Sequence, residues 1–364
     1  MKPPVYQELL TVMQSRKGPY AGLDIPEFYD LVEVLFTPEE AAVNNILAKQ
    51  PETLEQIAGR LKRDPKGLLP LLEAMAGKGL CATFIRDGQR VFKGVPFMPG
   101  IFEYQFIAGS DSAHYRQLAR LIHDYKKAYD AVKGLEKITF PVTRVIPVDK
   151  TIDAGNQIHT YDQVATYIQK YDSIGVGTCY CRHAARLRGE DIHDMSMEVC
   201  MWFGHAADYM VERIGGRKVT KAEALVLLDQ SEKAGLIHMS RNTSEEIEFL
   251  CNCDRWHCEV VTHVLKQPKP GRVFNSGYQP RFDPARCVAC ETCIDRCPPE
   301  ALTMGGDQLP TVNMDRCFGC AVCATGCPEA AISMVAKSGF PSPPANVKDL
   351  VAALKASHTQ QSNG

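Results

Sequence analysis

Eight of the fifteen cysteines fall in two runs that share one spacing. The runs are Cys287, Cys290, Cys293 and Cys297, followed by Pro298, and Cys317, Cys320, Cys323 and Cys327, followed by Pro328. Three thiolates at positions i, i+3 and i+6 of a tight loop can bind three corners of one iron–sulfur cube, which needs four ligands. The spacing therefore indicates two [4Fe–4S] clusters.

The fourth cysteine of each run is expected to bind the cluster of the other run, since it heads a new helix and cannot turn back. The predicted ligand sets are Cys287, Cys290, Cys293 and Cys327 for one cluster, and Cys317, Cys320, Cys323 and Cys297 for the other. The alternative is two four-cysteine zinc sites or a set of disulfides, although zinc ribbons use separated CxxC pairs.

Residues 275–336 resemble a dicluster ferredoxin domain, with all eight cysteines and both prolines in place. The resemblance implies two [4Fe–4S] clusters that each change by one electron. Hydrogen bonds, solvent exposure and charge then set the potential of each cluster.

Composition and charge narrow the class of protein. The 364 residues are 45% hydrophobic and 23% charged, which suits two or three globular domains. No run reaches the roughly 18 apolar residues of a membrane span, and the first ten residues lack a signal-peptide core, so neither membrane insertion nor export is expected. So many cysteines in a chain of this size favour clusters loaded in a reducing cytoplasm. A net charge of −2 argues against bulk nucleic-acid binding.

Residues 36–94 have the pattern of three helices followed by a hairpin. Helix caps and turn residues mark these elements: Thr37 with Glu40, Thr53 with Gln56, Asp64 with Pro65, Gly79, and Asp87 with Gly88. The order resembles a winged helix, so residues 1–100 are assigned to a winged-helix-like domain.

A winged helix could bind DNA through basic side chains of its third helix and wing. The candidates are Lys62, Arg63, Lys66, Arg86, Arg90 and Lys93. Pro70 is expected to interrupt the third helix, whose outer positions offer few side chains for base edges. A structural or protein-docking role is therefore favoured.

The remaining segments are assigned by composition and periodicity. Residues 101–144 form a connector with a long amphipathic helix over 111–134. Residues 267–280, rich in proline and glycine, are interpreted as a linker into the ferredoxin-like domain at 275–336. Residues 337–364 are predicted to be an extended arm and a tail, disordered after residue 356.

Residues 145–266 form a central cysteine-rich domain, which is predicted to be mostly helical. Cys179 and Cys181 end a strand-like run, Cys200 lies near the start of a helix over 201–214, and Thr220 with Glu223 caps a further helix. The chain then returns to a last group of cysteines, which is Cys251, Cys253 and Cys258.

Thiols from three separate segments suit one metal site, so a third [4Fe–4S] cluster is predicted. The candidate ligands are Cys179, Cys181, Cys200, Cys251 and Cys253. Zinc and unligated thiols are the alternatives. Cys258 is set aside because it lies several residues beyond the Cys251–Cys253 turn, and Cys81 is expected to fill a core. Arg182 either offsets cluster charge or lies on the surface. His183, His193 and His205 are expected to be structural.

The central and N-terminal parts resemble a family of multi-cluster ferredoxin-like proteins common in anaerobes. The shared motifs are the CxCR of Cys179 to Arg182, Cys200 before the FGxxAxxY stretch at 203–209, and the CNC at Cys251 to Cys253. The sequence departs from the family after the CNC, where Asp254 and His257 stand in a segment richer in cysteine elsewhere.

The sequence thus predicts an α+β protein that relays single electrons to or from a partner oxidoreductase. Whether it is itself an enzyme is left open, because a three-cysteine central cluster would offer an iron to substrate. A cluster-dependent transcription regulator is a second alternative. Self-association into a homo-oligomer is also left open.

Overall fold

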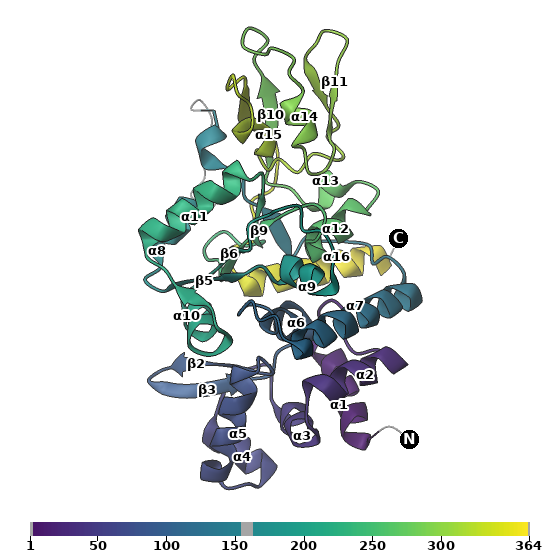
Figure 1. Cartoon of the computed structure of the whole chain (residues 1–364), viewed down its shortest axis with the longest axis vertical. Helices are drawn as coiled ribbons and strands as arrows, with labels where there is room; N and C mark the ends of the chain where they lie inside the picture. The colour runs from purple at the N-terminus through teal and green to yellow at the C-terminus, as the bar shows by residue number, and fades with distance from the viewer. Residues whose placement is uncertain (1–2, 154–162, 363–364) are drawn as a thin grey trace. The chain divides into compact units, whose positions relative to one another are not determined.

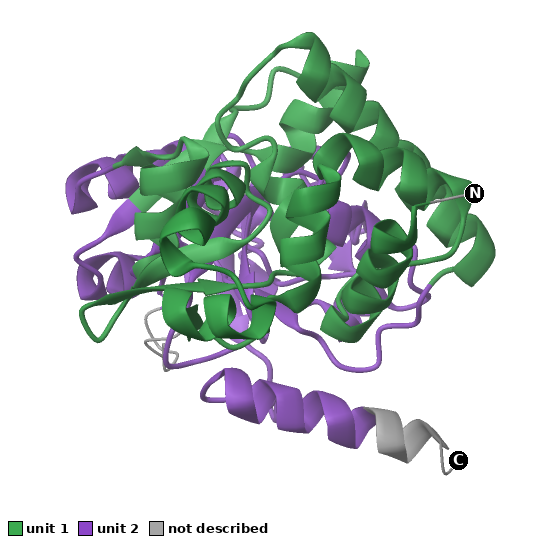
Figure 2. Cartoon of the chain, turned by 90° about the horizontal axis from the view of Figure 1, so that it is seen from below, with its two compact units in different colours: residues 1–135, 175–198, 205–218 green, residues 136–174, 199–204, 219–364 purple. Residues whose placement is uncertain are grey.

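The computed structural model describes residues 3–153 and 163–362, in which helices and sheet are mixed (Figure 1). The chain is therefore α+β, as predicted. It divides into two compact units, each built from several stretches of sequence (Figure 2). Unit 1 comprises residues 1–135, 175–198 and 205–218, and unit 2 comprises residues 136–174, 199–204 and 219–364. Within the described ranges, no helix combines the length and apolar character needed to cross a membrane.

Unit 1 holds the N-terminal elements and two later stretches of helix and strand. Its elements are α1 (Pro4–Arg16), α2 (Pro26–Leu35), α3 (Pro38–Ile46), β1 (Glu52–Thr53), α4 (Leu54–Leu61), α5 (Pro65–Gly77), β2 (Ala82–Arg86), β3 (Gln89–Lys93), the irregular turn η1 (Phe97–Ile101), α6 (Phe102–Tyr104), α7 (Ala113–Lys133), β5 (Ile174–Thr178), α9 (Tyr180–Arg188), α10 (His205–Tyr209), η4 (Met210–Ile214) and β7 (Arg217–Lys218).

The three-helix and hairpin pattern near the N-terminus is confirmed element by element. Thr37 and Thr53 each form a capping box with the predicted partner, and strands β1, β3 and β2 form one antiparallel sheet. The expected interruption at Pro70 is wrong, because α5 continues through it. Its missing N–H removes one backbone bond, and packing of Leu68 and Leu72 in the core maintains the helix.

The long helix predicted over 111–134 is confirmed as α7. Its buried face carries Leu118, Ile122 and Tyr125. The Tyr125 ring meets Phe28 and Phe97 edge-on, each at 6.0 Å between ring centroids. These aromatic contacts form the core of unit 1 between α2 and α7.

Unit 2 holds the two cysteine runs and four strands of a larger sheet, each paired antiparallel with its neighbour. Its elements are β4 (Thr143–Val145), η2 (Asp149–Thr151), α8 (Val164–Lys170), β6 (Glu198–Phe203), α11 (Lys221–Lys233), β8 (Ile237–Arg241), β9 (Phe249–Cys253), α12 (Glu259–Leu265), α13 (Pro270–Val273), β10 (Tyr278–Phe282), α14 (Thr292–Asp295), β11 (Leu302–Met304), β12 (Pro310–Val312), α15 (Val322–Thr325), β13 (Ile332–Ala336) and α16 (Val347–Ser362). The order of these four strands is β4-β8-β9-β6.

The central region differs from its sequence-based description in three ways. It contains five strands as well as helices, so it is not mostly helical. Cys200 lies within strand β6 rather than at a helix start, and the helix that follows begins only at His205. Cys251 and Cys253 lie in strand β9 and not in a turn. Alternation of buried and half-buried residues along β6 marks it as a strand with two different faces.

The C-terminal tail was predicted to be disordered after residue 356, and this is wrong over the described residues. Helix α16 runs over Val347–Ser362, while the last two residues lie outside the described ranges. The preceding arm is irregular, as expected. It is attached by backbone hydrogen bonds from Ser244 to Pro344 and from Glu245 to Ala345.

Candidate iron–sulfur sites

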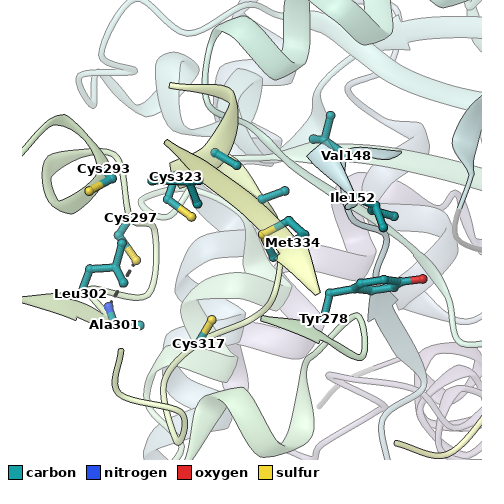
Figure 3. Close-up of a cluster of buried hydrophobic side chains, with 13 residues drawn as sticks. Val148, Ile152, Tyr278, Cys293, Cys297, Ala301, Leu302, Cys317, Cys323 and Met334 are labelled. Atoms are coloured by element: carbon teal, nitrogen blue, oxygen red, sulfur yellow. Dashed lines mark hydrogen bonds between the residues drawn. The ribbon is translucent and has the colours of Figure 1, made fainter. Parts of the chain in front are cut away.

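The two cysteine runs surround two cavities in unit 2. The first is lined by Cys287, Cys290, Cys293 and Cys327, together with residues of β11 to β13. The second is lined by Cys297, Cys317, Cys320 and Cys323. Each cavity therefore takes three cysteines from one run and the fourth from the other. Figure 3 shows Cys293 and Cys323 on opposite sides of Cys297, within one core that also holds Tyr278 and Met334.

Each loop reaches this geometry through two residues in the left-handed region. In the first loop these are Ala289 (φ 53°) and Glu291 (φ 60°), and in the second they are Gly319 (φ 66°) and Ala321 (φ 68°). Positive φ lets the loop curl so that successive thiols face one cavity, at a steric cost for residues other than glycine. Short helices α14 and α15 then follow and carry the chain toward the fourth cysteine.

The fourth cysteines accept equivalent hydrogen bonds. The Ala301 amide lies 3.2 Å from Cys297 Sγ, drawn in Figure 3, and the Ala331 amide lies 3.3 Å from Cys327 Sγ. Amide donors to a ligating sulfur stabilise the thiolate and raise the reduction potential of a cluster. Both cavities thus carry the same polar support at this ligand.

The cysteines that line the two cavities differ in burial. Cys290 is exposed and Cys287 and Cys327 are half-buried, whereas all four cysteines of the second cavity are buried. A hydrogen bond from the Thr292 hydroxyl, 3.4 Å away, lowers the pKa of the Cys290 thiol. Burial raises the pKa of the Cys320 and Cys323 thiols, and it raises the pKa of Cys297 to about 11.

The segment at 267–280 covers the second loop and is not a linker. The Asn275 amide donates to the carbonyl oxygen of Cys317 at 2.7 Å, and the Ser276 hydroxyl donates to that of Gly319 at 2.7 Å. A Cβ on Gly319 would lie 2.3 Å from the backbone oxygen of Tyr278. Within the segment itself, a Cβ on Gly271 would lie 2.6 Å from the backbone oxygen of Cys317, so this glycine permits close backbone packing against the loop.

The central cysteines are divided between the two units. Cys179 follows β5 and caps α9, in which Cys181 lies, and both belong to unit 1. Cys200, Cys251 and Cys253 belong to unit 2, as does Cys258.

The reason for setting Cys258 aside does not hold. Its thiol is hydrogen-bonded to that of Cys253, which also bonds to Cys251. These bonds, to Cys251 first, and burial hold the pKa of Cys253 well above its ordinary value.

Other residues singled out from the sequence are placed as follows. Arg182 is fully buried, so the surface alternative is wrong. His183 lies 2.9 Å from the backbone oxygen of Ser110 and is structural, as predicted. His193 and His205 lie beside Asp191 and Asp208, respectively. Cys81 fills the core of unit 1, where burial raises its pKa to about 12.

A buried polar chain beside β9 was missed by the sequence reasoning. His238 Nδ1 lies 2.6 Å from Asn252 Oδ1, and its Nε2 lies 3.5 Å from the carboxylate of Glu232. Lys150 pairs with the same carboxylate. Asn252 stands between Cys251 and Cys253, so this series of polar contacts holds strand β9 in place. Single polar residues in apolar strands form no recognisable sequence motif. Only their burial in the structure identifies them as part of this series of contacts.

Within the part of the chain that the structure describes, no three His, Cys, Asp or Glu side chains converge on a position for one metal ion. The ferredoxin-type cysteines share this property. Four thiolates that bind different irons of a cube lie farther apart than ligands of a single ion.

Comparison with known families bears on the first run. Residues 280–303 match the model of the 4Fe-4S binding domain, Fer4, a stretch that contains Cys287, Cys290, Cys293 and Cys297. The chain is an iron–sulfur protein. This iron–sulfur protein has at least one [4Fe–4S] cluster. No curated protein matches the chain.

Proposed function

We propose that this iron–sulfur protein relays single electrons between a partner oxidoreductase and its central cysteine region. Two [4Fe–4S] clusters would form the outer steps. The first is bound by Cys287, Cys290, Cys293 and Cys327, and the second by Cys297, Cys317, Cys320 and Cys323. The observation that carries the proposal is the pair of four-cysteine cavities, of which the first includes the exposed Cys290 and the second is lined by four buried cysteines.

The exposure suggests a direction for the relay. A partner can approach the first cluster closely at Val288 and Cys290, since Val288 is 63% exposed. The second cluster lies inside, where Cys320 and Phe318 pack in one core with Cys253 and Cys258. Electrons would therefore enter or leave through the first cluster and reach the central region through the second.

A third [4Fe–4S] cluster would form the inner end of this relay. The sequence offers Cys179, Cys181, Cys200, Cys251 and Cys253 as its ligands. About twelve irons per chain are then expected after anaerobic purification. Iron and acid-labile sulfide corresponding to only two clusters would refute the third.

The relay order can be tested with Cys327→Ser and Cys297→Ser, which change one ligand of the first and second clusters. A reduced polymeric viologen, too large to enter the fold, would supply electrons while electron paramagnetic resonance follows each cluster. Cys297→Ser should leave reduction of the first cluster fast and slow that of the central cluster. Cys327→Ser should slow both steps. Unchanged central reduction in both variants would exclude a relay through these clusters.

The N-terminal winged-helix-like segment is assigned a structural or docking role. Several of its basic side chains are already ion-paired within unit 1. Arg63 pairs with Glu39 at 2.9 Å and Arg90 with Glu212 at 2.8 Å. Pairing reduces the charge available for phosphates, so nucleic acid is not the proposed partner. Nanomolar DNA binding at physiological salt, abolished by changing Lys66 and Arg90, would overturn this assignment.

A further inference from the structure

Three cysteines of unit 2 share one apolar core. Cys253 and Cys258 are buried in this core, and the half-buried Cys251 packs against it. The Cys253 thiol has hydrogen-bond partners in Cys251 and Cys258. These thiols need no metal to pack, but they offer three sulfur ligands within one core.

A strand register brings a fourth cysteine to the same face. Met201 on β6 lies opposite Leu250 on β9 in an antiparallel pair. One step along this register places Cys200 opposite Cys251. The strands stay close there, because the Asn252 side chain donates to the backbone oxygen of Val199 at 2.6 Å. Opposed residues of an antiparallel pair share a face, and Cys253 lies on it two residues beyond Cys251.

A tight turn explains how Cys258 returns to Cys253. The Asp254 carboxylate accepts the backbone N–H groups of Trp256 and His257, at 2.8 and 2.6 Å. This side-chain bonding closes a turn directly after β9, and the chain enters α12 at Cys258. Asp254 therefore serves to shape the turn. The number of residues between Cys253 and Cys258 suggests by itself that Cys258 lies too far from Cys253. The turn removes this objection.

We infer that Cys200, Cys251, Cys253 and Cys258 are the four ligands of the central [4Fe–4S] cluster. The inference rests on the proposed function for the existence of that cluster. The set is complete within unit 2, so neither Cys179 nor Cys181 is a ligand. It also adjoins the second ferredoxin-type loop, because Cys320 and Phe318 share its core. An electron that leaves the second cluster would therefore reach the central cluster next.

The test compares iron and zinc content of anaerobically purified full-length variants. Cys258→Ser and Cys200→Ser should each lower the iron content by about four atoms per chain. Cys179→Ser should retain all of it, and Cys81→Ser serves as the control for loss of a buried thiol elsewhere. Where serine oxygen keeps the cluster partly bound, the electron paramagnetic resonance signal of the central cluster should change in Cys258→Ser and not in Cys179→Ser.

The outcomes separate this ligand set from the proposed function. Wild-type protein with only about eight irons would remove the central cluster itself. Wild-type protein with about twelve irons, of which Cys258→Ser keeps all with an unchanged spectrum, would overturn the ligand set alone. Loss of central iron in Cys179→Ser would also overturn it, as would zinc at about one per chain with eight irons. Cys179→Ser, which removes a ligand of the alternative set only, decides the question if Cys258→Ser does not fold.

Discussion

The two cysteine loops have the same spacing but opposite surroundings. Val288 of the first loop is 63% exposed, and Phe318 at the corresponding position of the second is fully buried. The Phe318 ring packs edge-on against Phe274 at 5.1 Å between centroids. Spacing thus sets which thiols meet, while the residues between and around the cysteines set how far each site lies from water.

The cause of the difference lies in the cover over the second loop. Asn275 and Ser276 bond to the carbonyl oxygens of that loop. The second loop uses Gly319 where the first uses Ala289, although both residues have positive φ. Only Gly319 needs to be glycine for space, because the backbone of Tyr278 lies against it.

The largest expected effect is on the survival of the two proposed ferredoxin-type clusters. A chelator or air should remove iron from the first site well before the second, because the exposed Cys290 corner admits water and oxidant. Iron release should then be biphasic, and spectroscopy should assign the fast phase to the cluster weakened by Cys327→Ser. A single phase for both clusters would show that burial does not protect the second.

A matched pair of substitutions tests the cover directly. Gly319→Ala should destabilise the protein by roughly 2–5 kcal/mol, from positive φ and the close approach of Tyr278. Ala289→Gly, at the same place in the first loop, should change the free energy of unfolding by less than about 1 kcal/mol. Anaerobic thermal or denaturant unfolding measures both. Equal effects would mean that the two loops are constrained alike.

A smaller effect is expected from the hydrogen bonds that hold the loops. Asn275→Ala should cost about 1–3 kcal/mol, since it removes buried bonds to the oxygens of Cys317 and Gly271. Thr292→Val, beside the exposed Cys290, should cost no more than about 0.5 kcal/mol. Unfolding midpoints of the two variants provide the comparison, and a larger loss in Thr292→Val would contradict it.

The smallest effect concerns thiol reactivity in the iron-free protein. A thiol is alkylated as its thiolate, so the lowered pKa of Cys290 gives it a larger reactive fraction at about pH 8 than Cys320, whose pKa is raised. Raising the pH should accelerate alkylation of Cys320 more than that of Cys290. Mass spectrometry of peptides reports each site. The same pH profile at both cysteines would show that burial does not separate their pKa values in the iron-free protein.

Local signals in the sequence were sufficient for many elements. Capping boxes at Thr37, Thr53 and Thr220 placed helix starts correctly, because their bonds form between residues three apart. The grouping of each cysteine triplet around one cavity followed from spacing in the same way. Where the bonding partners are neighbours in the chain, the pattern alone was enough.

The errors arose where distant partners decide the outcome. The sequence predicts a helix that starts next to Cys200, but pairing with β9 makes this segment a strand. The segment at 267–280 has the composition of a linker, yet its bonds to residues 317–319 bury it. The partners of Cys200 and of residues 267–280 cannot be read from the local sequence. Cys258 is a different case, because the turn at Asp254 is closed by bonds only two and three residues along the chain, and this local signal was missed.

The pairing of β10 with β13 has a consequence for inheritance. Tyr278 lies opposite Ala336, and the ladder ends with Phe282 opposite Ile332, so both cysteine runs lie between two hydrogen-bonded ends. A stretch that leaves and re-enters a fold at one point can be inserted into a surface loop without separating the residues on either side. We therefore expect that residues 278–336 could be transferred between proteins as one segment, provided that the new host supplies the contacts now made by residues 270–277 and by Val148 and Ile152.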